Sequence, residues 1–375
     1  METAAHAAIG LVLLWGISLS SATGAFADTP IPRAALVREE ARLEATYGES
    51  QVIEHQMLWV RPAGNGPFPL AVVTHGTDEK TLRETRPESY IGIAEEMARR
   101  GWAAAVVMRR GYGRSGGRYA EPVGSTCRAA DYVTAGNATA DDLETMINAL
   151  SRMPVVDARQ IVALGQSSGG LGVTALAGRA ISGLKGVVSF SGGRGARPPN
   201  ADCEERLVTA YATFGSSAKV PSVWLYAEGD SFFRPELIRF LYKTYNDNGG
   251  RATLHLLTGI EGDGHTLFRR RNIPRWREPL DAFLRSNELP TWTLGPPDHC
   301  PGGTPPVRLG ETGLRLWKDY LCGESYKAFA YSQEDDRVGY AFFHNSMEAA
   351  TKDAIRFCVG DRPERKCRVV ATDDQ

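Results

Sequence analysis

A short turn between an apolar run and a small-residue run is the strongest guide to the fold of this chain. Residues 161–164, Ile-Val-Ala-Leu, are apolar, and residues 165–169 read Gly-Gln-Ser-Ser-Gly. Residues 170–176, Gly-Leu-Gly-Val-Thr-Ala-Leu, are mostly small and predict a helix. A G-x-S-x-G segment between a strand and a helix holds its serine on a sharp turn, where the glycines relieve crowding. The pattern predicts that Ser167 is a nucleophile.

A second match to this pattern serves as an internal control. Residues 113–117, Gly-Arg-Ser-Gly-Gly, also fit G-x-S-x-G, but residues 118–122, Arg-Tyr-Ala-Glu-Pro, do not begin a helix. Since the strand-turn-helix setting is what makes such a serine reactive, the context favours a simple turn at Ser115 and a nucleophile at Ser167.

Candidate partners for Ser167 follow it along the chain. Residues 221–227 predict a buried strand with Asp230 just beyond its end, and residues 252–257 predict another strand whose following loop carries His265. A nucleophilic serine in this setting is followed first by an acid and then by a histidine. We therefore predict that His265 is the base and that Asp230 orients its ring.

Other titratable residues nearby are alternatives for these roles. Glu228 is the second choice as the acid. Asp263 is expected to shape the turn before His265, and His255 lies inside an alternating strand, where a histidine is usually structural. His75 precedes the serine in the chain, so we expect it to shape its loop rather than to act as the base.

Two backbone N–H groups are predicted to stabilise an oxyanion. One belongs to Ser168, directly after the nucleophile, and the other to Thr77, which follows a predicted strand at residues 68–74. Gly76 gives the backbone room beside Thr77. The predicted chemistry is acyl transfer in two steps through an acyl-enzyme, which needs no metal or organic cofactor.

The coarse pattern along the chain alternates strands and helices. Residues 103–108 predict a strand, residues 91–100 a helix, and residues 139–152 a helix capped by Thr139. Continuous apolar strands between helices indicate a mostly parallel sheet covered on both faces, and therefore an α/β fold.

Five segments between residues 50 and 286 carry a family resemblance: residues 75–76, 110–115, 165–170, 228–230 and 262–265. Together they resemble the α/β-hydrolases, in the style of the dienelactone hydrolase and prolyl oligopeptidase branches. The resemblance implies the α/β-hydrolase fold and a serine hydrolase. Because dienelactone hydrolases carry cysteine as the nucleophile, Ser167 favours a carboxylesterase acting on small or medium esters. A prolyl-type peptidase and a non-catalytic binding protein on a hydrolase scaffold are the alternatives.

The first residues of the chain have the features of an export signal. An apolar run over residues 7–17 has the length of a signal-peptide core, and Ala-Phe-Ala at residues 25–27 fits the cleavage pattern. We expect a signal peptide over residues 1–27 and a periplasmic or secreted protein. An uncleaved membrane anchor is the alternative, for which the apolar run is short.

The remainder divides into a catalytic unit over residues 28–286, a proline- and glycine-rich linker over residues 287–307 and a small module over residues 308–375. Residues 192–219 are expected to form a small cap. The module is predicted to be α+β, similar to small cysteine-bearing modules appended to exported bacterial proteins. Its predicted elements are strands at residues 327–332, 338–343 and 367–371 and a helix at residues 346–357.

Cysteine usage and charge complete the sequence evidence. The chain has six cysteines, an even number that fits an oxidising destination. Cys358 and Cys367 bracket a turn and suit a helix-to-strand bridge, whereas Cys127 and Cys203 are a separate candidate pair. The formal net charge of −1 gives no sign of a nucleic-acid partner. A run of arginines such as residues 269–271 most often lies on a solvated face. The alternative is that this run biases the site toward anionic substrates.

Overall fold

The computed structural model describes residues 36–121, 124, 126, 129–195, 201–291, 303–322, 326–342, 344 and 346–372. The predicted signal peptide and most of the predicted linker lie outside these residues, so both stay predictions. In the described part of the chain, no helix is long and apolar enough to cross a membrane.

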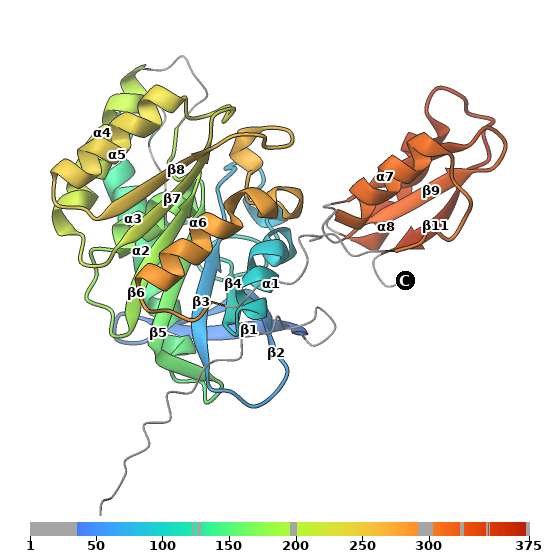
Figure 1. Ribbon diagram of the computed structural model, residues 1–375. Helices are drawn as coiled ribbons and strands as arrows, with labels where there is room; N and C mark the ends of the chain where they lie inside the picture. The colour runs from blue at the N-terminus through green and yellow to red at the C-terminus, as the bar shows by residue number, and fades with distance from the viewer. Residues whose placement is uncertain are drawn as a thin grey trace, which may run out of the picture.

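A mixed sheet forms the centre of the larger unit (Figure 1). Among the described residues its strand order is β1-β2-β4-β3-β5-β6-β7-β8. The neighbours from β4 to β8 pair in parallel, and β2 pairs antiparallel with both β1 and β4. The strands are β1 (Leu36–Tyr47), β2 (Gln51–Pro62), β3 (Phe68–Thr74), β4 (Ala103–Val107), β5 (Val156–Gln166), β6 (Leu184–Phe190), β7 (Ser222–Ala227) and β8 (Ala252–Leu257).

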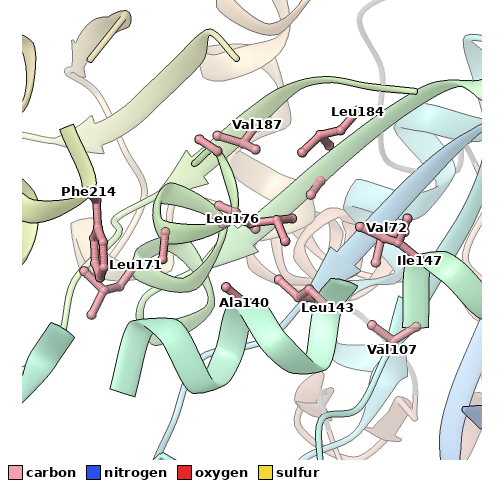
Figure 2. Packing of buried hydrophobic residues seen from close by; sticks show 14 of the residues in the cluster. Val72, Val107, Ala140, Leu143, Ile147, Leu171, Leu176, Leu184, Val187 and Phe214 are labelled. Atoms are coloured by element: carbon pink, nitrogen blue, oxygen red, sulfur yellow. The ribbon is translucent and has the colours of Figure 1, made fainter. Parts of the chain in front are cut away.

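Helices cover both faces of this sheet, because strands that are apolar on both sides must be shielded from water on both sides. One face packs against α1 (Ile91–Arg99) and α6 (Ile273–Ser286). The other packs against α2 (Tyr132–Leu150), α3 (Ser168–Leu176), α4 (Ala201–Ser217) and α5 (Pro235–Asp247). Figure 2 shows the apolar core between the sheet and this second group of helices, where Leu143 and Ile147 of α2 lie near Val72 and Val107 of the sheet. The predicted mostly parallel α/β fold is confirmed.

Helix α2 begins earlier than the predicted start at Thr139. The carboxylate of Asp131 accepts a hydrogen bond from the backbone N–H of Thr134 at 2.9 Å and caps the first turn. Thr139 lies inside the helix instead, and its hydroxyl donates to the carbonyl of Ala135 at 3.2 Å. Asp131 therefore supplies the cap that the sequence analysis assigned to Thr139.

The segment predicted to be a cap, residues 192–219, is mostly a layer helix. Within it, α4 contributes Leu207, Ala210, Tyr211 and Phe214 to the core on the α2 face of the sheet. These positions recur at helical spacing, so the apolar stripe of α4 must face the sheet. The cap prediction is corrected over Ala201–Ser217. The loop before α4, with Arg194, is the part that borders the cavity described below.

A small α+β module follows the larger unit, as predicted. Strands β9 (Ala328–Ser332), β10 (Arg337–Ala341) and β11 (Arg368–Thr372) pair antiparallel in the order β10-β9-β11, beside α8 (Met347–Val359). Helix α7 (Glu311–Cys322), which was not predicted, packs Trp317 and Tyr320 against Phe329. These aromatic side chains give the module a core of its own.

The predicted disulfide between Cys358 and Cys367 is confirmed. It joins the last turn of α8 to the residue before β11, which is the helix-to-strand link expected from the sequence. Cys203 is also disulfide-bonded. Its predicted partner, Cys127, lies outside the described residues.

Candidate active site

Ser167 lies on the turn between β5 and α3, in a backbone conformation with φ 54° and ψ −119°. This region is costly for a residue with a side chain, so the surrounding structure must enforce it. The N–H of Ser167 donates to the carbonyl of Phe190 at 3.0 Å. A Cβ at Gly165 would meet the backbone of Gly169, and one at Gly169 would meet the carbonyl of His75. Both glycines are therefore needed for the close approach that shapes the turn.

The three residues of the predicted triad lie within hydrogen-bond distance of one another. Nε2 of His265 is 3.1 Å from Oγ of Ser167. Nδ1 of the same ring is 3.1 Å and 3.2 Å from the two carboxylate oxygens of Asp230. The residues follow β5, β7 and β8, whose ends meet at one edge of the parallel sheet. Their catalytic roles stay predictions, but their arrangement is that of a nucleophile, a base and an orienting acid.

Backbone groups hold the carboxylate of Asp230 in place. Its Oδ1 accepts hydrogen bonds from the N–H groups of Phe232 at 2.9 Å and Phe233 at 3.1 Å. The residue is buried, with 8% of its surface exposed. These contacts leave the carboxylate facing His265, whose ring packs against Phe232 with 4.4 Å between the ring centroids.

The alternative acids have other surroundings. Glu228 is exposed, and among the described residues no hydrogen bond or ion pair joins it to His265. Asp263 accepts from the backbone N–H of His265 at 2.9 Å and from the hydroxyl of Ser231 at 2.6 Å. Asp263 therefore shapes the turn, as expected, and it also ties the loop of Asp230 to the loop of His265.

His75 is fully buried and bonded through both ring nitrogens. The backbone N–H of Arg109 donates to Nε2 at 3.2 Å, so Nδ1 carries the ring proton and donates to the carbonyl of Gly76 at 2.8 Å. Burial, together with the charge of Arg109, holds the pKa of His75 well below its usual value. A neutral ring with both nitrogens engaged fits the predicted loop-shaping role. His255 is half-buried within β8, where burial lowers its pKa.

Thr77 and Ser168, the predicted oxyanion donors, flank Ser167. Among the described residues, no protein acceptor is found for the backbone N–H of either one. The neighbouring N–H of Gly76 is occupied, since it donates to the hydroxyl of Tyr90 at 3.0 Å. The side chains of Thr77 and Ser168 contact each other directly, with 2.6 Å between the hydroxyl oxygens.

A cavity of about 440 Å³ opens onto Ser167 and His265. One part of its wall is aromatic and the other is polar and hydroxyl-rich, with residues from the segment after β3. The remaining lining residues are Gly76, Thr77, Asp78, Thr81, Glu84, Thr85, Ser89, Tyr90, Gln166, Ser168, Arg194, Gly195, Phe232 and Phe233.

The arginine run at residues 269–271 does not line this cavity. Arg270 is buried and pairs with Glu95 at 2.6 Å, and Arg271 lies over the ring of Phe342. The run therefore gives no support to a bias toward anionic substrates. Among the described residues, no group of three or more His, Cys, Asp and Glu side chains is arranged to hold a metal ion.

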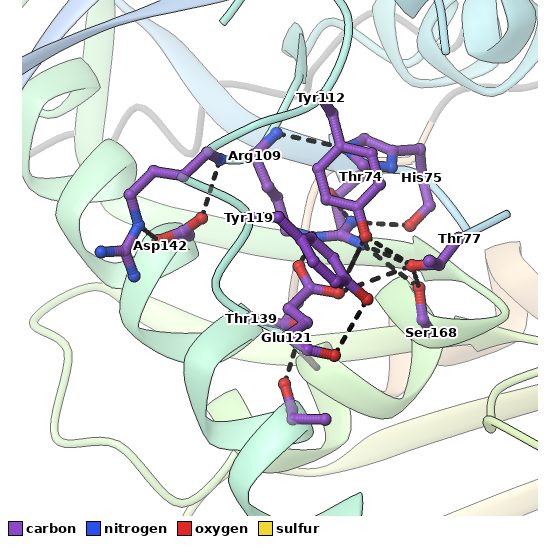
Figure 3. Close-up of polar contacts among 12 residues, drawn as sticks. Thr74, His75, Thr77, Arg109, Tyr112, Tyr119, Glu121, Thr139, Asp142 and Ser168 are labelled. Carbon is purple, nitrogen blue, oxygen red and sulfur yellow. Dashed lines mark hydrogen bonds and ion pairs between the residues drawn. The ribbon is translucent and has the colours of Figure 1, made fainter. Parts of the chain in front are cut away.

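A buried polar cluster behind Thr77 and Ser168 was missed by the sequence analysis (Figure 3). It centres on Arg109 and Glu121, which are both buried and hydrogen-bonded to each other. In the sequence, Arg109 is one of two adjacent arginines after a predicted strand, and such a pair most often lies on a solvated face. The position of Arg109 two residues after the end of β4, whose residues are all buried, was the available signal for burial.

Residues 69–214 match the model of a protein family described as serine aminopeptidase, S33. Solved structures with a similar chain path include an esterase from Pyrococcus furiosus, with 15% identity over 66% of this chain and 90% of that one and a TM-score of 0.46. A protein from Klebsiella pneumoniae, provisionally identified as a dienelactone hydrolase, has 13% identity over 68% and 99% and a TM-score of 0.46.

A third similar structure is the acylaminoacyl peptidase of Pyrococcus horikoshii, with 15% identity over 70% of this chain and 43% of that one and a TM-score of 0.46. None of the curated protein sequences matches the chain.

Proposed function

We propose that this chain, which has the α/β-hydrolase fold and whose residues 69–214 match a hydrolase family model, is a serine hydrolase that cleaves small or medium carboxylic esters. One observation carries the proposal, which is the hydrogen-bonded series from Ser167 through His265 to Asp230 at a cavity. A serine hydroxyl is a weak nucleophile unless a base removes its proton, and this series supplies the base and its orienting acid.

In the proposed first step, Oγ of Ser167 attacks the ester carbonyl carbon while Nε2 of His265 accepts the hydroxyl proton. The carbonyl oxygen becomes an oxyanion, which the N–H groups of Thr77 and Ser168 stabilise. The intermediate then collapses, the bond to the alcohol oxygen breaks, and His265 returns the proton to the leaving alcohol. Asp230 keeps the ring in the tautomer that has its proton on Nδ1.

In the second step, water attacks the acyl-enzyme in the same geometry. His265 accepts a proton from the water as its oxygen attacks the acyl carbon. The second tetrahedral intermediate then collapses, the bond from the acyl carbon to Oγ breaks, and His265 returns the proton to Oγ of Ser167, which releases the free acid. The reaction consumes one ester and one water and yields one acid and one alcohol. The side chains named here account for each proton transfer.

A fluorophosphonate probe tests the activated nucleophile directly. The mature protein would be treated with the probe, and the adduct would be located by peptide mass spectrometry, with His265→Ala as the control. Labelling of Ser167 that is lost in the control supports the proposal. A folded wild-type protein that remains unlabelled contradicts it and favours a binding protein on a hydrolase scaffold.

Peptide hydrolysis is the second candidate activity, because the matching family is described as a serine aminopeptidase. Amide and ester hydrolysis share the same acyl-enzyme, so the substrate decides between them. We would compare kcat/KM for aminoacyl anilides with kcat/KM for aryl esters of graded acyl length. A higher value for the anilides would replace the esterase proposal with the peptidase.

We also propose export and removal of residues 1–27, on the apolar run and the cleavage pattern in the sequence. The full chain would be expressed in a bacterial host and recovered from the periplasm for N-terminal sequencing. A mature start at Asp28 supports export, whereas recovery of the intact N-terminus from the cytoplasm contradicts it.

A further inference from the structure

We propose that Arg109 and Glu121 are positioning residues that hold Thr77 and Ser168 in register, so that their N–H groups converge on the oxyanion. This inference rests on the proposed hydrolase function. The four residues come from three separate segments, which follow β3, β4 and β5. Figure 3 shows their side chains gathered behind the turn that carries Ser168.

The anchor of the cluster is an ion pair with two hydrogen bonds. Nε of Arg109 donates to Oε1 of Glu121, and Nη2 donates to Oε2 at 3.1 Å. Burial alone would raise the pKa of Glu121, but the charges of Arg109 and Arg194 outweigh it and lower the pKa to about 2. The carboxylate is therefore charged near neutral pH and can only accept hydrogen bonds.

A chain of hydroxyl groups runs from this carboxylate to Ser168. The hydroxyl of Tyr112 is 3.1 Å from Oε2 of Glu121 and 2.6 Å from Oγ1 of Thr77, which is in turn 2.6 Å from Oγ of Ser168. Each hydroxyl has one proton to donate. Oε2 of Glu121 is 3.1 Å from the hydroxyl of Tyr112 and 3.5 Å from that of Thr77, so the shorter contact makes Tyr112 the donor to the carboxylate. Thr77 then donates to Tyr112, and Ser168 donates to Thr77.

Arg109 completes the arrangement from the other end. Its Nη2 lies 3.2 Å from Oγ of Ser168 and 3.4 Å from Oγ1 of Thr77, so these oxygens accept from the guanidinium while their protons point along the chain. Nη1 donates to the carbonyl of His75 at 2.7 Å, which fixes the backbone two residues before Thr77. The guanidinium thus contacts both sides of the proposed oxyanion site.

The consequence is a fixed separation between two donors on different loops. Hydrogen-bond donors stabilise an oxyanion only when they are placed in advance at the correct positions. Thr77 is held to Ser168 through side chains alone, which leaves both backbone N–H groups for the substrate. The hydroxyl chain extends the contacts of the Arg109–Glu121 ion pair to Thr77 and Ser168, so the pair is connected to both loops that carry the proposed donors.

Loss of single hydroxyl groups tests this inference without leaving a buried charge unpaired. Thr77→Val and Ser168→Ala both keep the backbone N–H and the Arg109–Glu121 pair. For aryl ester hydrolysis, we expect each to lower kcat about tenfold to a hundredfold with little change in KM, because misplaced donors weaken transition-state binding. Thr77→Ser restores the hydroxyl and should recover most of the rate. Thr145→Val on α2 is the matched control and should match the wild type.

The double variant Thr77→Val with Ser168→Ala distinguishes a coupled unit from two separate effects. If the two hydroxyls act together, the kcat of the double variant is no lower than the kcat of the less active single variant. Losses that multiply would overturn the positioning role. A trifluoromethyl ketone forms a tetrahedral adduct with the serine. If the hydroxyls position the oxyanion donors, each variant should bind this ketone more weakly by the same factor by which its kcat/KM falls. If the hydroxyls are purely structural, the two factors should not correlate.

Two failures can be told apart. A wild-type protein that neither hydrolyses esters nor reacts with a fluorophosphonate overturns the proposed function and this inference with it. A wild-type protein that is active while Thr77→Val retains the full kcat overturns the positioning role alone. Arg109→Lys provides a second measurement. Lysine keeps the positive charge but lacks the several fixed N–H donors of the guanidinium, so we expect this variant also to have a lower kcat.

Discussion

Nε2 of His265 lies 3.1 Å from Oγ of Ser167, although the two residues are 98 positions apart in the chain. The parallel sheet explains the approach, because the loops after β5 and β8 leave the sheet at the same edge. Asp230 joins them from the loop after β7. Hydrogen bonds within these loops, such as those from the N–H groups of Phe232 and Phe233 to Asp230, hold the series in place before any substrate binds.

Ser167→Ala and His265→Ala should each lower kcat for ester hydrolysis by on the order of 10⁴-fold or more, because each removes an indispensable part of one proton transfer. The double variant should be no worse than either single one. Steady-state kinetics on a common aryl ester measures all three. A double variant that loses the product of the single effects would show that the two residues do not act as a unit.

Asp230→Asn should lower kcat by about 10⁴-fold, because an amide cannot hold the imidazole in the required tautomer or stabilise its charged form. Glu228→Gln is the matched control, since Glu228 is exposed at the same loop. The two variants would be compared at the same pH on the same ester. If Glu228→Gln were the damaging change, the assignment of the acid would have to be reversed.

Local pattern was enough to predict the turn around Ser167. Its apolar strand, its glycines and its small-residue helix are neighbours in the sequence, and the structure shows them in that order. Asp230 and His265 lie on the loops after β7 and β8, as predicted, and these loops meet because the strand ends of a parallel sheet share an edge. These predictions needed only the period of the apolar residues and the order of the elements.

The cluster around Arg109 could not be predicted in the same way. Thr77, Arg109 and Ser168 meet only after three segments have folded together, and each looks ordinary within its own segment. The cap prediction failed for a different reason. Glycine and proline before residue 201 suggested a loop, whereas the spacing of Leu207 and Phe214 along α4 was the better signal for a packed helix.

His75→Ala should destabilise the fold without abolishing the nucleophile. It removes a buried hydrogen bond from Arg109 and a partly buried one to Gly76, so we expect the free energy of unfolding to fall by about 1–3 kcal/mol. Denaturant unfolding measures this change. Fluorophosphonate labelling of Ser167 should persist in the folded variant, and its complete loss would instead indicate that His75 takes part in the chemistry.

Replacing both Cys358 and Cys367 by alanine should lower the stability of the small module by about 2–3 kcal/mol. The disulfide closes a loop with a sequence separation of 9, which restricts the unfolded chain. Limited proteolysis followed by mass spectrometry would report opening at β11 or α8. Cleavage within the module at the wild-type rate would show that the bond contributes little to its stability.

Acid should destabilise the protein over a defined range of pH through Glu121. Although burial opposes ionisation, the charge of Arg109 lowers the pKa of this carboxyl from the usual value of 4.5 to about 2. A lowered folded-state pKa gives stability that is fully present above pH 4.5 and is lost as the pH falls through 2. This shift corresponds to about 3 kcal/mol. We therefore expect the free energy of unfolding to decline between pH 4.5 and 2.

Glu121→Gln should lower stability at neutral pH and flatten that decline, because the amide does not titrate and leaves Arg109 without its buried counter-charge. The exposed Glu39→Gln is the control and should keep the wild-type slope. Urea unfolding at a series of pH values gives the slope for each protein. If Glu121→Gln kept the full slope, the decline would have to arise from other carboxyls, such as Glu96, whose pKa the charge of Arg100 also lowers to about 2 against its burial.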